Sequence, residues 1–410
     1  MTTTSPLQVL PQYRAARAAV AAMFLTNGAI FANLLPRYPQ LKADLGLSNA
    51  EFGLAVAAFP CGALMAGLSA GSLVRRFRSS RVAVAGTLLT SLGVLLAGLA
   101  QSWGMLAAAL FCAGGLDAIT DVAQNSHGLR VQRLYGRSIL NGFHAVWSIG
   151  AVVGGLMGGL AAGLDLPRGI HLSLSALLFA AVALTALRFA LPGPEPTTPG
   201  EPAEADAQKD RTPAQRGAAG PGHVWLIIGA LVLIACGGIM VEDAGMTWAA
   251  VYLSGTLGAE AAVASFGFVA LVGAQFIGRL LGDGLVDRFG QRAVARAGGA
   301  TTALGMSAAL LFPSVPGTIA GFACAGFGVA TLVPAAMHGA DELPGLRAGT
   351  GLTVVSWLMR LGFLASPPIV GLVADALGLR VGLLVVPLAG TLVVLLAGVL
   401  SAARARPPRL

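Results

Sequence analysis

The chain has 410 residues, of which 56% are hydrophobic and only 11% are charged, and its mean hydropathy is +0.77. Soluble proteins contain about 25% charged residues, so this composition excludes a soluble globular protein and predicts a polytopic membrane protein. The net charge is +8, but the arginines stand in short clusters between apolar runs, which argues against a nucleic-acid partner.

Twelve apolar segments are long enough to cross a membrane, since a spanning helix needs about 20 mostly apolar residues. We therefore predict an all-α membrane protein with twelve transmembrane helices. The first segment continues to about Leu35, which is too long for a cleaved signal peptide. The predicted spans are 15–36, 49–74, 82–101, 103–128, 138–163, 169–191, 223–253, 261–286, 293–312, 315–338, 348–374 and 380–402.

Basic residues are distributed unevenly between the two sides of this topology. With both termini in the cytoplasm, most of the loop arginines and lysines fall on the cytoplasmic side, as the positive-inside rule expects. Residues 192–222 form the one long interruption and are rich in Pro, Gly, Ala and Glu, so we predict a disordered cytoplasmic linker. It separates an N-terminal bundle of six helices (1–191) from a C-terminal bundle of six (223–410).

The two halves repeat each other in sequence. GALMAGLSAGSLVRRFRSSR begins at Gly62, and the similar GAQFIGRLLGDGLVDRFGQR begins at Gly273, at an offset of 211. In the fifth and eleventh spans, Arg137 and Trp147 align with Arg347 and Trp357 at an offset of 210. Two like halves around a central pathway are typical of transporters.

The segment GLVDRFGQR, residues 284–292, resembles the loop signature of the major facilitator superfamily, and the resemblance covers essentially the whole chain. It implies two six-helix bundles related by a pseudo-two-fold axis, and a gating loop made of Asp287, Arg288, Gly290 and Arg292. By this resemblance Asp287 braces the start of the fifth span near Arg137. The first-half copy departs from the signature, because Arg75 replaces the acid and Arg78 the glycine. DAITDVAQN, NGFHAVWSIG and VEDAGMTWAAVYL are similar to a poorly characterised bacterial branch near the sugar permeases.

Two local patterns make structural predictions. Ser48 and Glu51 form an S-x-x-E capping box before the second span. Gly150, Gly154 and Gly158 recur every four residues in the fifth span, which predicts a bare helix face that a neighbouring helix approaches closely.

The fourth span carries a polar stripe. Asp117 and Asp121 are four residues apart and share one helix face, which continues through Asn125 with Gln124 alongside. Two carboxylates about 6 Å apart along the axis make each other's ionisation more costly, so we expect one of them to be protonated at neutral pH. The stripe predicts proton coupling; a purely structural pair is the alternative.

The seventh span contains two adjacent acids, Glu242 and Asp243, which point in directions about 100° apart. We expect Glu242 to face a central cavity and to be a candidate for proton coupling, and Asp243 to be the less certain candidate for the same role. Trp248 and Tyr252 follow at four-residue spacing and could stack on a ring-bearing solute, or form an interfacial aromatic belt instead.

Other polar residues inside spans are candidates because such groups are costly in a membrane. Arg360 needs an anionic partner near mid-membrane, either a span carboxylate or an anionic group of the substrate, and is a candidate for substrate binding. Arg279 is expected to pair locally with Asp283. His144 could titrate near neutral pH or be a hydrogen-bonded interior residue. The remaining candidates for substrate contact are Gln124 and Asn125 of the polar stripe, together with Asn27, Asn33, Trp147, Gln275 and Trp357.

The function that the sequence predicts is secondary active transport of a small polar or amphipathic solute by alternating access, coupled to protons. Proton-coupled efflux of drugs or metabolites and a non-transporting receptor of the same fold stay open as alternatives. No P-loop or HExxH motif occurs, and the four cysteines lack metal-site spacing, so we expect no enzyme, cofactor or metal. We expect a monomer in the bacterial inner membrane, with protons, a small solute and the lipid bilayer as partners.

Overall fold

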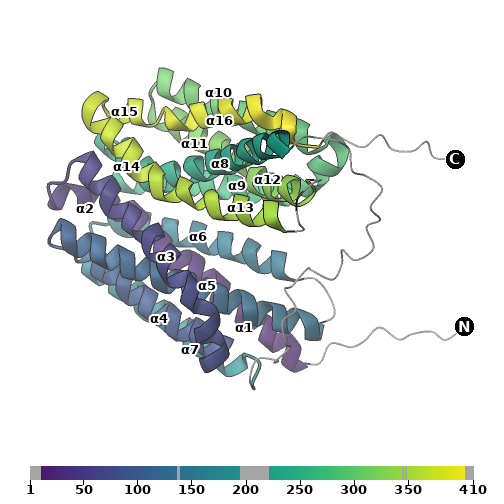
Figure 1. Ribbon diagram of the computed structural model, residues 1–410. Coiled ribbons are helices and arrows are strands. Elements are labelled where there is room, and N and C mark those ends of the chain that lie inside the picture. Colours follow the sequence, from purple (N-terminus) through teal and green to yellow (C-terminus); the bar gives the residue numbers. More distant parts are fainter. Residues whose placement is uncertain (1–10, 136–138, 194–220, 344–345, 347–348, 402–410) are drawn as a thin grey trace, which may run out of the picture. The chain divides into compact units, whose positions relative to one another are not determined.

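The computed structural model describes residues 11–135, 139–193, 221–343, 346 and 349–401 (Figure 1). Every secondary-structure element within these residues is a helix. The first half contains α1 (Pro11–Ala32), η1 (Leu35–Arg37), α2 (Tyr38–Asp44), α3 (Asn49–Phe77), α4 (Ser79–Gly98), α5 (Trp103–Tyr135), α6 (Leu140–Gly163) and α7 (Arg168–Phe189). The second half contains α8 (Pro221–Gly255), α9 (Ala261–Phe289), α10 (Gln291–Leu311), α11 (Val315–Val329), α12 (Leu332–Asp341), α13 (Thr350–Leu358), α14 (Arg360–Leu377), α15 (Leu379–Gly382), α16 (Val385–Leu396) and η3 (Ala397–Val399).

Eleven segments of the described chain are long and apolar enough to span a membrane, one fewer than the twelve predicted. The difference is α10, which matches the predicted span 293–312 in position but does not qualify by composition. Its 21 residues include Arg292, Arg296 and several hydroxyl side chains, which make it less apolar than its neighbours. Most of the predicted disordered linker lies outside the described residues.

The chain divides into two compact units. Unit 1 takes the described residues of 1–37 and 58–195, and unit 2 takes those of 38–57 and 196–410. The division differs from the halves of the sequence in one place, because α2 and the first nine residues of α3, 49–57, count with unit 2.

The same packing pattern occurs in both units. In unit 1, α4 packs against α5 and α7, and α1 packs against α6 and α7. In unit 2, α10 packs against α11 and α16, and α8 packs against α14 and α16. The internal sequence repeat makes each helix of one unit equivalent to a helix of the other. Equivalent helices therefore have equivalent packing partners in the two units.

The glycine face predicted for the fifth span is confirmed. A Cβ atom added at Gly150 or Gly154 of α6 would lie within 3.0 Å of the backbone carbonyl of Leu25 or Ala29 on α1, and one added at Gly158 would lie within 3.0 Å of the carbonyl of Asn33, just after α1. These carbonyls stand one turn apart, so three successive turns of the two helices are in backbone contact. Small residues permit this close approach, which replaces hydrophobic burial as the source of helix association in lipid.

The start of α3 is held by side chains from two places. The predicted capping box is confirmed: the Ser48 amide donates to Glu51 Oε2 (2.9 Å), and the Glu51 amide donates to Ser48 Oγ (3.1 Å). Within unit 2, the amides of Asn49 and Ala50 also donate to the two carboxylate oxygens of Asp375, at 2.8 and 2.9 Å. A carboxylate at this position satisfies free N–H groups and complements the positive end of the helix dipole.

The repeated loop has the same backbone geometry in both halves. Gly290 joins α9 to α10 with φ 82° and ψ 155°, and Arg78 joins α3 to α4 with φ 73° and ψ 140°. Glycine enters this region freely, whereas a side chain is strained there. Arg78 therefore carries strain at the position where the loop signature has glycine.

Candidate functional site

Unit 1 contains a hydrogen-bonded chain across three helices. Asn27 on α1 donates from Nδ2 to Asp117 Oδ1 on α5 (2.8 Å), and Trp147 on α6 donates from Nε1 to Asn27 Oδ1 (2.8 Å). The amide of Asn27 thus joins a carboxylate to an indole, and each group is oriented by the next. The structure brings together three residues that the sequence put forward separately.

The remainder of the α5 stripe lies one and two turns further along. Asn125 donates to the carbonyl and the carboxylate of Asp121 at 2.9 Å each, and its Oδ1 lies 3.2 Å from His144 Nε2 on α6. Gln124 faces away from this set: it is buried and donates to the Met23 carbonyl at 3.1 Å. Asp121 and His144 are both exposed, so they can meet solvent or solute.

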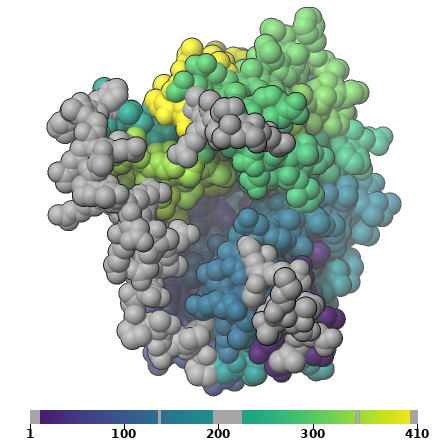
Figure 2. Space-filling view, turned by 90° about the vertical axis from the view of Figure 1, so that its right-hand side faces the viewer, coloured from purple at the N-terminus to yellow at the C-terminus, as the bar shows by residue number. Residues whose placement is uncertain are grey.

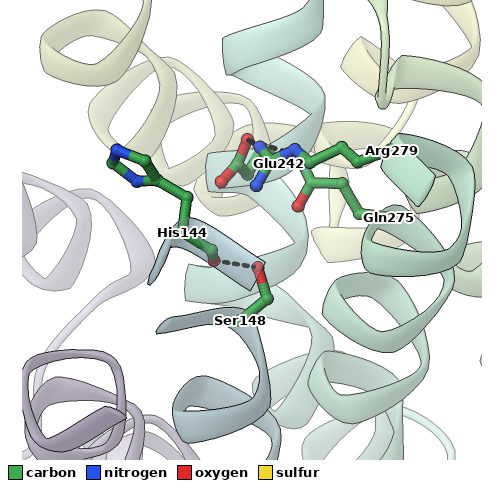
Figure 3. A network of polar contacts seen from close by, with 5 residues as sticks. All are labelled: His144, Ser148, Glu242, Gln275 and Arg279. Carbon is green, nitrogen blue, oxygen red and sulfur yellow. Dashed lines mark hydrogen bonds and ion pairs between the residues drawn. The ribbon is translucent and has the colours of Figure 1, made fainter. Parts of the chain in front are cut away.

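Unit 2 contains a second carboxylate–amide pair. Gln275 on α9 donates from Nε2 to Glu242 Oε2 on α8 at 2.7 Å, and Arg279 Nη2 lies 3.7 Å from the same oxygen (Figure 3). Gln275 and Arg279 are one turn apart, so both reach Glu242 from one face of α9. The expected pairing of Arg279 with Asp283 is therefore wrong, because a neighbouring helix supplies a better-placed acid.

The two adjacent acids of α8 have different surroundings. The Glu242 side chain is 17% exposed and paired, whereas Asp243 is 8% exposed and its Oδ2 has no hydrogen-bond partner within the described residues. The different orientations follow from the helical rotation between neighbours. An ionised carboxylate with a buried, unpaired oxygen is costly.

The two aromatic candidates of α8 are completely buried in unit 2. Trp248 packs edge-on against Phe52 of α3 (ring centroids 5.6 Å apart), and Phe52 packs against Tyr38 of α2 (5.1 Å). The indole Nε1 of Trp248 and the hydroxyls of Tyr252 and Tyr38 have no hydrogen-bond partner within the described part of the chain. Their roles as solute contacts stay predictions, and in this arrangement neither ring is open to solute. Sequence reasoning missed Tyr38 and Phe52, which lie about 200 residues from Trp248.

Asn33 lies in a buried cluster at the far end of α1. Its Oδ1 is 2.9 Å from His171 Nε2 and accepts from Ser175 Oγ (3.2 Å), while Arg37 donates to His171 Nδ1 (3.4 Å) and to the Leu166 carbonyl (2.9 Å). Asn33 Nδ2 also donates to the Ala29 carbonyl, so both polar atoms of the Asn33 side chain are hydrogen-bonded inside unit 1. This placement favours a structural role.

The equivalent tryptophans of the two halves do not have equivalent surroundings. Trp147 is half-buried and hydrogen-bonded, whereas Trp357 is 61% exposed at the end of α13. The helix of the predicted eleventh span is interrupted only at Met359, whose backbone stays in the right-handed helical region (φ −60°, ψ −26°), and α14 begins at Arg360. Together α13 and α14 form one candidate span, Thr350–Leu377. Arg360 is exposed and has no ion pair within the described residues.

The predicted gating loop joins α9 and α10. Arg292 donates from Nε to the Leu400 carbonyl (3.0 Å), and the Arg288 guanidinium lies over the Phe289 ring, 5.2 Å from its centroid. Asp287 is exposed. Its predicted contact near Arg137 falls outside the described residues, since 136–138 are not among them, and stays a prediction.

The described residues contain no group of three or more His, Cys, Asp and Glu side chains that could hold a metal ion. What they do contain, in each unit, is a carboxylate on one span that accepts from the amide of another. Such pairs can exchange protons and can offer hydrogen bonds to a polar solute.

Two overlapping matches to the model of the family described as Major Facilitator Superfamily cover residues 20–283 and 239–410. An uncharacterized transporter of Sinorhizobium fredii, y4wD, is 30% identical over 93% of this chain and 97% of its own length. Membrane protein MosC of Rhizobium meliloti is 28% identical over 92% of this chain and 88% of its own.

Solved structures share the fold at low sequence identity. A bacterial homolog of the human lysosomal transporter Spinster superposes with a TM-score of 0.71 and 15% identity, over 95% of this chain and 98% of that one. The nucleoside transporter NupG (D323A mutant) superposes with a TM-score of 0.70 and 13% identity, over 93% and 98%.

Proposed function

Because the chain belongs to the major facilitator superfamily, we propose that this multi-pass membrane transporter moves a small polar or amphipathic solute by proton-coupled alternating access. Its relatives and fold neighbours include transporters, and it is not an enzyme. We further propose the bacterial inner membrane as its location, with both termini cytoplasmic, twelve spans in bundles 1–191 and 223–410, and a monomer as the working form.

One observation carries the proposal: the two units each place a carboxylate of one span against the amide of another. The distances are alike, 2.8 Å for Asn27 and Asp117 and 2.7 Å for Gln275 and Glu242. Ionisable groups inside membrane spans are expensive and mark substrate or proton pathways. Such a carboxylate can accept a hydrogen bond when ionised and donate one when protonated, so its protonation can change which bonds a solute makes.

The acids then have different proposed roles. Glu242, balanced by Arg279 and partly exposed, is suited to hold a polar group of the solute. Asp243, buried with an unpartnered oxygen, and Asp117, beside Asp121, are suited to take up protons. Ring-bearing polar solutes are the probes we choose: nucleosides because a fold neighbour is a nucleoside transporter, and hexoses because of the resemblance to a branch near the sugar permeases.

The test begins with purified full-length protein and a thermal-shift screen of nucleosides and hexoses, because a ligand of the native state raises apparent stability. Any solute that binds is then followed into proteoliposomes with and without an imposed pH gradient. We expect flux to depend on the gradient in the wild type and in Glu260→Gln, an exposed acid just before α9 that serves as the control.

Asp117→Asn and Asp243→Asn should each uncouple flux from the gradient, and Glu242→Gln should weaken solute binding. Gradient-independent flux in the wild type would show that proton coupling is wrong. A solute that binds but is never transported would support the receptor alternative. Comparison of right-side-out with everted vesicles distinguishes uptake from efflux.

A further inference from the structure

An apolar groove lies between α1 and α7 on the surface of unit 1. Its volume is about 540 Å³, and it is lined by Ala18 and other small residues of α1 and by Ala181, Thr185 and Phe189 of α7. The lining is apolar except for Thr185, whose hydroxyl donates to the Ala181 carbonyl at 2.7 Å. Because both helices qualify as membrane spans, lipid chains are the medium that this groove meets.

Two arginines flank the same end of the groove. Arg14 stands on the first turns of α1, one turn before Ala18, and Arg188 stands on the last turn of α7, three residues after Thr185. The helical rotation places Arg14 on the side of Ala18 and Arg188 on the side of Ala181, which are the exposed sides of the groove. Both arginines are exposed and have no ion pair or hydrogen bond within the described residues. Figure 2 shows the face of the molecule on which α1 begins; the purple atoms of α1 lie near the lower edge.

We propose that this groove binds an anionic phospholipid, with an acyl chain along the alanines and the phosphate between Arg14 and Arg188. Lipid tails are as apolar as the groove, so the acyl chain by itself supplies little preference for one lipid over another. The preference comes from the charges, because guanidinium groups bind phosphate oxygens with strong, directed hydrogen bonds. Basic residues between helices at a membrane surface are typical of sites for anionic headgroups.

The test uses purified full-length protein in a neutral detergent, titrated with dioleoylphosphatidylglycerol or dioleoylphosphatidylcholine. Melting temperature and bound lipid, counted by native mass spectrometry, are the two readouts. We expect phosphatidylglycerol to stabilise and bind more strongly. Each of Arg14→Gln and Arg188→Gln should lower its apparent affinity about five-fold, since a basic residue near the surface contributes about 1 kcal/mol.

The matched control is the pair of single variants Arg81→Gln and Arg133→Gln, each of which removes one charge from an exposed position of unit 1 outside the groove lining. Each should bind phosphatidylglycerol as the wild type does. Ala181→Phe, at an exposed lining position, fills the groove without a change of charge and should also lose the lipid, which covers the case in which the arginine variants fail to fold.

Equal binding of the two lipids, equal loss in the control pair, or an equal effect of inorganic phosphate would each overturn the proposal. None of these outcomes depends on solute transport, so the test of the lipid site is independent of the test of the proposed function.

Discussion

Replacement of the strained Arg78 by glycine should stabilise the protein. Arg78 has φ 73° and ψ 140°, close to a region that is essentially restricted to glycine, where another residue costs about 1–3 kcal/mol. Glycine costs about 0.5–1 kcal/mol more than alanine in chain entropy on folding. The Arg78 side chain is exposed, so its removal costs little, and the expected net gain is about 1 kcal/mol.

The assay is thermal unfolding of purified protein in one detergent, with two comparison variants. Gly290→Ala places a side chain in the equivalent loop at φ 82° and should destabilise by a similar amount. Arg81→Gly removes an exposed arginine two residues into α4 and should destabilise by about 1 kcal/mol, because glycine weakens a helix. If Arg78→Gly melts at or below the wild-type temperature while Arg81→Gly behaves as expected, the strain argument is refuted.

Three further changes test contacts within single units. Gly154→Ala should lower the melting temperature, since overpacking against the Ala29 backbone costs about 1–3 kcal/mol and cannot be relieved by a rotamer change, whereas Gly142→Ala on the same helix has open space and should not. Asn27→Leu should destabilise by about 2 kcal/mol in a thermal melt, because it leaves a carboxylate and an indole without their partner; an unchanged melt would mean that water replaces the amide. Asp375→Asn should speed hydrogen–deuterium exchange at the first amides of α3, and unchanged exchange would show that the capping box suffices.

The sequence predicts features that depend on neighbours in the chain. The apolar runs place nearly every helix within a few residues, because the cost of leaving backbone groups unsatisfied in lipid forces such runs to be helical. Ser48 with Glu51, and the spacing of Gly150, Gly154 and Gly158, act through one helix turn and were predicted for that reason.

Features that depend on which helices meet could not be predicted. Arg279 has Asp283 one turn away in sequence, but the fold brings Glu242 closer, and nothing in either segment alone records that choice. The burial of Trp248 against Phe52 likewise depends on residues 38–57 packing in unit 2. The interruption of the helix at Met359 occurs in an apolar run that has no proline at that point, so the local sequence does not predict it.

The boundary between the two units passes through the interior of α3. Val56 belongs to unit 2 and Pro60 to unit 1, and Pro60 has no N–H to donate to the carbonyl of Val56. The missing helical hydrogen bond therefore falls across the boundary itself. The proline therefore makes α3 easiest to bend at this point, whereas its first turn is held by the hydrogen bonds to Asp375.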